Sequence, residues 1–248
     1  MKFSILASGS KGNASLIYTD NTLIQIDMGV TLKMVDAELK RLGKHRSDIQ
    51  GVFITHEHSD HISGLPLYHG KIPVYTSEGT LPKAMHLIHP FVPLAIGDFN
   101  IVPFSVSHDA ANPVGYLIED EHSRLAWVTD TGCLSEEVIE LLKDCDYYYF
   151  ESNHDLKMLQ RSHRPASLKA RVRSDHGHLN NIDSAIYMAD LIGPHTKQIV
   201  LAHLSEECNT PDLALSSYEE TLARHEVDIA NIEIIPAARW ALTLGGEK

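Results

Sequence analysis

Thr-His-Glu-His-Ser-Asp-His, residues 55–61, places three histidines and an aspartate within six consecutive positions. This stretch follows residues 51–54, Gly-Val-Phe-Ile, a short apolar run that predicts a buried strand. Side chains alternate between the faces of an extended chain, so we expect His56 and His58 to point the same way. So many nitrogen and oxygen donors at a buried strand end indicate bound metal; the alternative is a solvated polar loop.

The end of the same stretch adds two more donors. A turn beginning near Ser59 would bring Asp60 and His61 to the same cavity, so that one segment serves two metals. A helical zinc-protease motif, H-E-x-x-H, is excluded because the residue four positions after His56 is Asp60.

Later strand-like runs end at candidate ligands, as a site on the rim of a sheet requires. His108 follows residues 104–107, Asp130 follows residues 125–129, and His203 follows residues 198–202. Asp27 likewise follows residues 22–26. It either supports ligating histidines through a hydrogen bond or caps a helix that begins near Thr31.

The pattern H-x-H-x-D-H after a strand resembles the signature of the metallo-β-lactamase superfamily. The resemblance implies an α/β fold, a four-layer αβ/βα sandwich. It also implies that His108 is the third histidine, that Asp130 bridges two metals, and that Asp27 supports the ligands without binding metal. The expected metal ligands are His56, His58, Asp60, His61, His108, Asp130 and His203.

Length and composition agree with one large α/β domain over residues 1–248. The chain has 43% apolar residues, and no linker or low-complexity tract interrupts it. Helical periodicity is visible near residues 32–42, 135–143, 183–192 and 212–225. The first residues carry too short an apolar run for a signal peptide, and no stretch approaches the roughly 18 residues of a spanning helix. We therefore expect a cytoplasmic protein without membrane insertion.

The three cysteines, Cys133, Cys145 and Cys208, show no C-x-x-C spacing. They predict reduced thiols rather than disulfides or a thiolate zinc site. Cys208 lies five residues beyond His203 and either approaches the cavity or, as we favour, packs as a small buried hydrophobe. No function is assigned to it.

The net charge of −12 argues against generic nucleic-acid binding, which needs positive charge. The charge is uneven, however, because basic residues dominate residues 157–178. Four arginines are the candidate phosphate contacts in this stretch: Arg161, Arg164, Arg171 and Arg173. The alternative is a solvated face that balances acidic neighbours.

Two further segments resemble the tRNA 3′-processing phosphodiesterases. Glu151 ends an aromatic strand-like run, and His178 precedes a probable helix upstream of His203. In those enzymes a glutamate and a histidine at these places form a pair that helps the leaving oxygen depart. A carboxylate stabilises a protonated imidazole, which suits a general acid. The alternative is that His178 merely caps its helix.

A narrower resemblance covers nearly the whole chain. Residues 8–13, 108–113, 151–155, 177–181 and 203–209 together look like the YycJ/WalJ/VicX family. That family implies a cytoplasmic, metal-dependent 5′-to-3′ exonuclease acting on DNA, with manganese the expected activator. In residues 8–13 Ser10 and Asn13 are candidate substrate contacts, although such a loop also makes a simple turn. His154 and His176 receive no role.

The family resemblance yields a mechanism. His56, His58 and His108 would hold one divalent metal, and Asp60, His61 and His203 the second, with Asp130 and a nucleophilic water between them. Asp60 would also accept a proton from the water, and His178, oriented by Glu151, would assist the leaving oxygen. Nitrogen and oxygen ligands suit zinc, manganese or iron.

Three other functions compete with this one. The first is hydrolysis of a small cyclic phosphodiester or a thioester, and the Glu151–His178 pair favours phosphate over thioester. The second is an RNA-processing nuclease, because the sequence does not reveal how a 2′-hydroxyl is sensed. The third is a metal-binding regulatory scaffold, although no acid–base position is visibly replaced. The oligomeric state stays unassigned.

Overall fold

The structure, a computed structural model, describes residues 1–82 and 86–247 and contains two compact units. The first unit comprises Met1–Ser105, Ala110–His122 and Ala238–Lys248. The second comprises Val106–Asp109 and Ser123–Ala237. The single domain expected over residues 1–248 stays a prediction.

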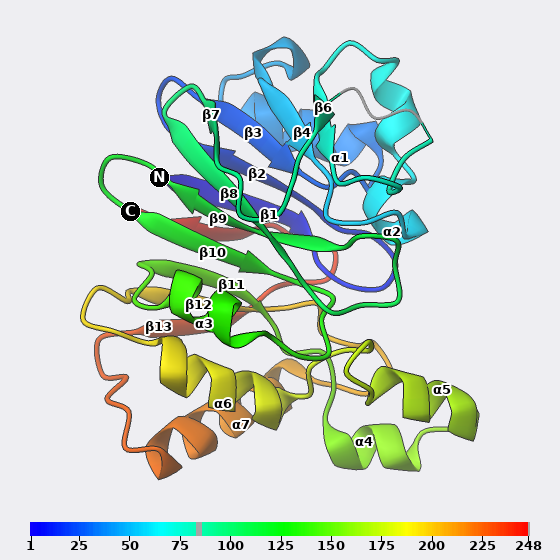
Figure 1. The fold of residues 1–248 in the computed structure, drawn as a ribbon, viewed down its shortest axis with the longest axis vertical. Coiled ribbons are helices and arrows are strands. Elements are labelled where there is room, and N and C mark those ends of the chain that lie inside the picture. Colours follow the sequence, from blue (N-terminus) through cyan, green and yellow to red (C-terminus); the bar gives the residue numbers. More distant parts are fainter. Residues whose placement is uncertain (83–85, 248) are drawn as a thin grey trace. The chain divides into compact units, whose positions relative to one another are not determined.

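A seven-stranded sheet forms the larger part of the first unit, in the order β14-β1-β2-β3-β4-β5-β6 (Figure 1). Neighbours from β14 to β3 are antiparallel, and those from β3 to β6 are parallel. The strands are β1 Lys2–Ala7, β2 Ala14–Tyr18, β3 Leu23–Ile26, β4 Gly51–Phe53, β5 Val74–Thr76, β6 His86–Leu87 and β14 Thr243–Gly246. Every residue of β3 and β4 is buried, as expected of interior parallel strands.

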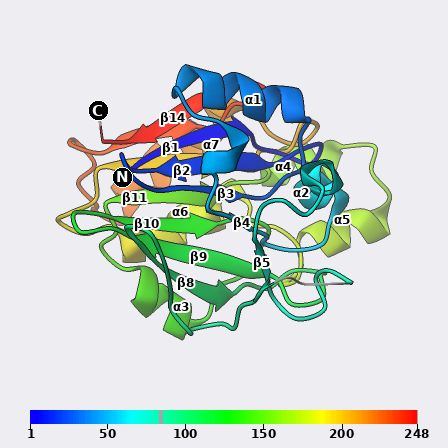
Figure 2. The ribbon, with the colours of Figure 1, turned by 90° about the horizontal axis from the view of Figure 1, so that it is seen from above.

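The first unit also contains an antiparallel meander and two α-helices. The meander consists of β7 Leu94–Ile96, β8 Phe99–Ser105 and β9 Val114–Glu119. The helices are α1 Leu32–Arg41 and α2 Ser59–Ile62, with short 3-10 turns at Arg46–Asp48 and Leu65–Tyr68. Helix α1 contacts β1 and buries Val35 and Leu39. Figure 2 shows this helix beside β14 and β1.

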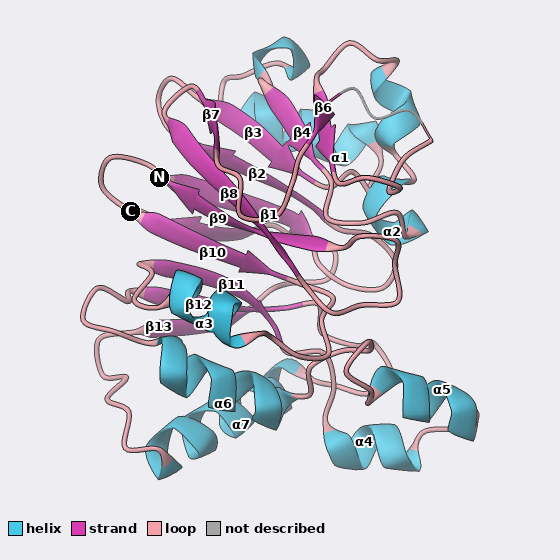
Figure 3. Ribbon diagram, in the orientation of Figure 1, coloured by secondary structure: helices cyan, strands magenta, loops and turns pink. Residues whose placement is uncertain are grey.

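The second unit is built on four parallel strands in the order β13-β12-β11-β10. They are β10 Arg124–Val128, β11 Tyr147–Glu151, β12 Gln198–Ala202 and β13 Glu233–Pro236. The helices are α3 Glu136–Leu142, α4 Leu156–Arg161, α5 Ala166–Val172, α6 Asn181–Leu191 and α7 Pro211–Arg224. Helices α6 and α7 pack against each other, which Figure 3 shows below the strands of this unit.

The predicted elements match these bounds closely. The helical stretches near residues 32–42, 135–143, 183–192 and 212–225 are confirmed as α1, α3, α6 and α7. The strands expected before the candidate ligands are confirmed as β3, β4, β10, β11 and β12. The strand expected over residues 104–107 is observed as β8, which begins earlier, at Phe99, and ends at Ser105. Helices α4 and α5 were not predicted, because each is too short to display a clear apolar stripe.

Parallel pairing collects the candidate residues at one edge within each unit. In the first unit, Asp27 follows β3 and residues 55–61 follow its parallel neighbour β4. In the second unit, Asp130 follows β10, Glu151 ends β11 and His203 follows β12. The carboxyl ends of parallel strands are the usual place for a site in such sheets.

Within residues 1–82 and 86–247, no helix has the length and apolar character needed to cross a membrane.

Candidate metal centre

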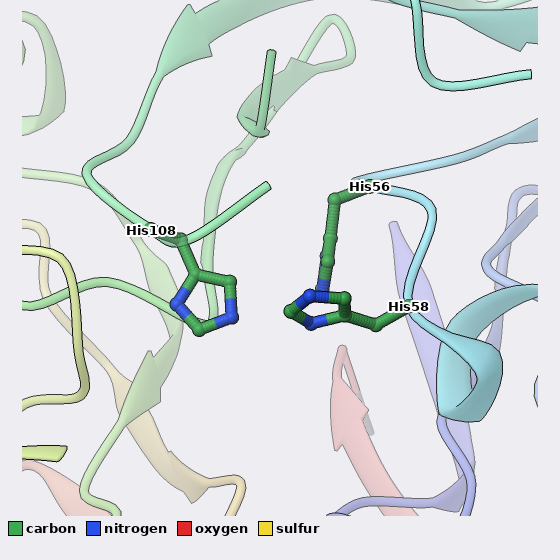
Figure 4. A group of neighbouring side chains, drawn as sticks. All are labelled: His56, His58 and His108. Atoms are coloured by element: carbon green, nitrogen blue, oxygen red, sulfur yellow. The ribbon is translucent and has the colours of Figure 1, made fainter. Parts of the chain in front are cut away.

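The histidines of the first unit gather directly after β4. The ring centroids of His56 and His58 are 4.6 Å apart, and those of His56 and His61 are 4.1 Å apart. The turn expected near Ser59 is helix α2, whose N-cap is His58 and which carries Asp60 and His61. Figure 4 shows that His56 and His58 extend from one loop, with His108 on the loop after β8.

The Asp27 carboxylate contacts one of these histidines directly and a second through Thr55. His61 Nδ1 donates to Asp27 Oδ2 at 2.8 Å, and the Thr55 amide donates to Asp27 Oδ1 at 2.9 Å. The Thr55 hydroxyl lies 3.0 Å from Asp27 Oδ2 and 3.1 Å from His56 Nδ1. Burial raises the pKa of the Asp27 carboxyl, although His61 and Thr55 act in the opposite direction. Because the Nδ1 proton of His61 points at Asp27, Nε2 carries the lone pair that a metal needs.

The alternative position of Asp27, as a cap of α1, is not observed. Helix α1 has Thr31 as its N-cap and no side-chain capping hydrogen bond. The Asp27 carboxylate is hydrogen-bonded to Thr55 and His61 instead.

Asn13 reaches the same ligands from the loop after β1. Its side-chain amide nitrogen lies 2.9 Å from His61 Nε2 and 3.2 Å from Asp60 Oδ2, and its Oδ1 accepts from the Gly9 amide. Asn13, expected to bind substrate, is only 4% exposed, whereas Ser10 of the same loop is exposed. The buried Asn13 amide therefore orients the Asp60 carboxylate and donates to His61 Nε2, and it is not open to a substrate.

Glu151 is the corresponding carboxylate of the second unit. Its Oε1 accepts from His178 Nδ1 at 2.8 Å and from His203 Nδ1 at 3.0 Å, and its Oε2 accepts from the Thr131 amide at 2.8 Å. Burial raises the pKa of the Glu151 carboxyl, but His178 and His203 outweigh burial and bring the pKa to about 2. Glu151 is thus an ionised acceptor that fixes two imidazoles.

His108 and His203 approach Asp130 within this unit. Asp130 Oδ1 is 3.4 Å from His203 Nδ1 and 3.8 Å from His108 Nε2. The other ring nitrogen of His108 donates to the Gly177 carbonyl at 3.0 Å. Burial lowers the pKa of His108 and so favours the neutral imidazole, the form that binds metal.

His178 does not cap helix α6. The N-cap is Asn180, whose side chain accepts from the amides of Ile182 and Asp183. His178 instead pairs with Glu151 and retains 18% exposure of its side chain. It is therefore oriented by a buried carboxylate while staying accessible to a substrate.

Three of the strand-end residues adopt a left-handed backbone conformation. The φ angles are 57° for Asp27, 53° for Asp130 and 54° for His203. This region costs a residue with a side chain on the order of 1 kcal/mol, and such conformations concentrate at functional sites. Each turn redirects the chain at the end of its strand.

The arrangement fits divalent metal. Within the second unit, Asp130, Glu151, His178 and His203 offer ligand atoms within 4.8 Å of one another. The Nδ1 atoms of His61, His108 and His203 each face an oxygen acceptor, which leaves the lone pair of each ring on Nε2. A donor set of imidazole and carboxylate suits zinc, manganese or iron.

The predicted arginines differ from one another in their surroundings. Arg171 pairs with Asp109 at 2.5 Å, and Arg164 pairs with Glu207 at 2.7 Å. Arg161 and Arg173 are exposed, and neither has an ion pair within the described part of the chain. The stretch is therefore less cationic than its sequence suggests.

Three side chains that were given no role from the sequence, Cys208, His154 and His176, have different surroundings. Cys208 is buried in a cluster with Leu159 and Val172, which confirms its reading as a small hydrophobe. His154 is fully buried, and burial lowers its pKa to about 4. The Nδ1 of His176 lies 3.1 Å from the hydroxyl of Ser107.

Sequence reasoning missed three supporting groups. Thr55 is the first residue of the histidine stretch and was given no role, although its position beside His56 was a usable signal. Asn153 donates to the His203 carbonyl at 2.9 Å, and the Gly177 carbonyl holds His108. Contacts between residues so distant in sequence leave no trace in spacing.

Comparison with known proteins places this geometry in a family. A family model described as a beta-lactamase superfamily domain matches residues 24–204. The chain belongs to the metallo-β-lactamase superfamily. Exodeoxyribonuclease YycJ of Bacillus anthracis is 40% identical over 235 residues, which covers 90% of this chain and 89% of the relative. Exodeoxyribonuclease WalJ of Streptococcus pneumoniae is 34% identical over 244 residues, covering 92% and 90%.

Solved structures agree on the fold of this metallo-β-lactamase superfamily member. YhfI of Bacillus subtilis, a metallo-beta-lactamase fold protein, has a TM-score of 0.70 at 16% identity, and the match covers 98% of this chain and 99% of YhfI. A diphosphatase from the PhnP family has a TM-score of 0.66 at 17% identity, covering 99% and 98%. The predicted αβ/βα sandwich class and the predicted YycJ/WalJ family are confirmed.

Replacement of Asn13 tests its contacts with the ligands. We expect Asn13→Ala to weaken metal binding about 10- to 100-fold, the usual effect of losing a group that orients a ligand. Competition against a chromophoric chelator measures this affinity. Ser10→Ala, at an exposed position of the same loop, is the matched control and should leave it unchanged. Equal metal affinity of Asn13→Ala and wild type, with both folded, would show that Asn13 does not orient the ligands.

Proposed function

We propose that this protein is a metal-dependent phosphodiesterase that removes nucleotides from DNA ends, as a 5′-to-3′ exonuclease. Support for the DNA substrate comes from the two relatives named exodeoxyribonucleases, which match about nine-tenths of the chain. The phosphodiesterase chemistry rests on one observation, the Glu151 oxygen that holds both His178 and His203. We also propose that the enzyme is cytoplasmic, a location that suits an enzyme acting on DNA.

The two units divide the proposed ligands between them. The first unit supplies His56, His58, Asp60 and His61, and the second supplies His108, Asp130 and His203. In this proposal His56, His58 and His108 would hold one ion, Asp60, His61 and His203 would hold the other, and Asp130 would serve both. Two bound cations, zinc, manganese or iron, supply activation of water and neutralisation of charge on the phosphoryl oxygens. Membership of the superfamily supports this division.

His178 acts on the leaving oxygen. Its Nδ1 is fixed on Glu151, so the other ring nitrogen is the one that donates a proton to the departing sugar oxygen. Asp60 lies in the first unit with its Oδ2 held by Asn13, and it accepts a proton from the attacking water. The proposed acid, His178, is thus held by the Glu151 carboxylate. The proposed base, Asp60, is held separately by the Asn13 amide.

Two alternatives are kept as outcomes of the experiments. A small cyclic phosphodiester would use the same acid and metal ligands, and so would an RNA end. A regulatory scaffold would need no accessible acid, yet His178 is both oriented and partly exposed. The observed geometry therefore favours an enzyme over a scaffold.

End-labelled substrates test the activity and its direction. We expect the metal-loaded protein to release the label of 5′-labelled DNA first as a mononucleotide, and to shorten 3′-labelled DNA progressively. Matched RNA and cyclic dinucleotides should be cleaved more slowly. Gel and thin-layer separation of the products gives the answer. Faster cleavage of RNA or of a cyclic dinucleotide would replace the proposed substrate, and release of the 3′ label first would reverse the polarity.

A leaving-group comparison tests His178. We expect His178→Ala to keep its metal and to lose roughly 10²- to 10⁴-fold in turnover of DNA, the scale of one acid–base group. The loss should shrink on a p-nitrophenyl phosphodiester, because p-nitrophenolate departs without a proton. Glu151→Gln should act in the same direction, and the double variant should be little worse than His178→Ala.

The control for this comparison is His176→Ala, which removes a nearby imidazole that contacts Ser107 rather than Glu151. Its turnover should stay close to wild type. An equal loss on both leaving groups would argue against proton donation by His178. Loss of metal from His178→Ala would make His178 a ligand.

A further inference from the structure

Trp240 is a large aromatic side chain that the first unit leaves 49% exposed. The other tryptophan, Trp127, is 2% exposed and stacks on Tyr149 with ring centroids 3.8 Å apart. An exposed indole suits the binding of a partner, because its flat face gives large contact area at little entropic cost. The two tryptophans therefore differ in what their rings can contact.

The six-membered ring of Trp240 rests against Gly12. A Cβ added at Gly12 would lie 3.0 and 3.2 Å from two atoms of that ring and 2.8 Å from the Gly29 carbonyl. Only a glycine lets the indole lie this close to the backbone of the loop. Gly12 directly precedes Asn13, whose amide contacts Asp60 and His61. Trp240 thus borders the loop that supports the proposed metal ligands.

Hydrogen bonds fix both the turn that carries Trp240 and the loop of Gly12 on which its ring rests. The turn that carries it is closed by a hydrogen bond from the Ala238 amide to the Thr243 hydroxyl at 2.9 Å. Thr243 begins β14, which pairs with β1, and the loop with Gly12 follows β1. The Asn13 amide nitrogen donates to the Asp60 carbonyl at 2.8 Å, and the Gly29 amide donates to the Asn13 carbonyl at 2.8 Å. The ring is therefore presented on a preorganised edge.

Basic residues accompany the exposed ring. Lys11 is an exposed neighbour of Gly12, and Arg239 directly precedes Trp240. Both are basic, in a chain whose net charge is −12. This is the combination by which proteins hold single-stranded nucleic acid, with cations on the backbone and rings under the bases.

We propose that Trp240 is a stacking platform for one unpaired base of the DNA strand, with the segment of Lys11 beside the strand's phosphate. The inference rests on the proposed function, because it assigns a base subsite to that nuclease. The base stacks on the open face of the indole, and every base has a face that suits it. The subsite is therefore indifferent to sequence and specific for single-stranded ends.

Binding without turnover tests the platform. The probes are a phosphorothioate-linked dT10, which resists cleavage, and an abasic strand of the same length, each added to metal-loaded protein. We expect Trp240→Ala to weaken dT10 binding about 5- to 150-fold, the effect of one base stack, and Trp240→Phe to retain most of the affinity. Quenching of tryptophan fluorescence on dT10 binding should vanish in Trp240→Phe, because Trp127 is buried.

The abasic strand and a second variant supply the controls. Wild type and Trp240→Ala should bind the abasic strand equally. Leu244→Ala should bind dT10 like wild type, although it also removes an exposed apolar side chain, one that is 47% exposed on β14. Equal binding of dT10 by wild type and Trp240→Ala would overturn the proposal. An equal loss on dT10 and the abasic strand would also overturn it, because Trp240 would then only support its loop.

Cleavage assays separate this inference from the proposed function. Protein that binds dT10 through Trp240 but does not cleave ordinary DNA would refute the nuclease and leave the platform standing. If wild type and Trp240→Ala cleave DNA equally well and bind it equally well, the platform would be refuted and the nuclease would stand.

Discussion

The site depends on two buried carboxylates that each hold the Nδ1 atom of a candidate ligand histidine. Asp27 does this for His61, and Glu151 does it for His203 while also holding His178. A buried carboxylate is costly unless several donors meet it, and backbone amides of Thr55 and Thr131 supply part of that compensation. The hydrogen bonds fix the imidazole tautomers, so that each ligand nitrogen is ready before a cation arrives.

The parallel strands explain why each unit has a buried carboxylate that accepts a hydrogen bond from a histidine. Asp27 follows β3 beside β4, and Glu151 ends β11 between β10 and β12. In both units the supporting carboxylate and the ligands therefore come from adjacent strand ends. The left-handed turns at Asp27, Asp130 and His203 aim these side chains, and the strain is tolerated because dense hydrogen bonding surrounds it. The candidate ligands and their supporting carboxylates therefore stand at strand ends, and pairing within each sheet fixes the positions of those strand ends.

Much of this could be predicted from the sequence, because the ligands stand in a recognisable order after apolar runs. The strand before each candidate ligand, four helices and the superfamily followed from periodicity and motif, and they are confirmed. The contact of Asn13 with Asp60 was not predictable, since residues 47 positions apart meet only in the fold. The ion pairs of Arg164 and Arg171 were hidden for the same reason: their acidic partners lie far along the chain.

The division of ligands between two ions is the central claim, and metal content tests it most directly. Elemental analysis of purified, metal-loaded protein should give two divalent ions per chain for wild type, and Asp130→Ala should lose occupancy at both sites. Asp109→Ala, which removes a carboxylate that lies beside His108 and pairs with Arg171, should keep both ions. One ion per chain in wild type, or two ions retained by Asp130→Ala, would contradict a centre in which Asp130 serves both metals.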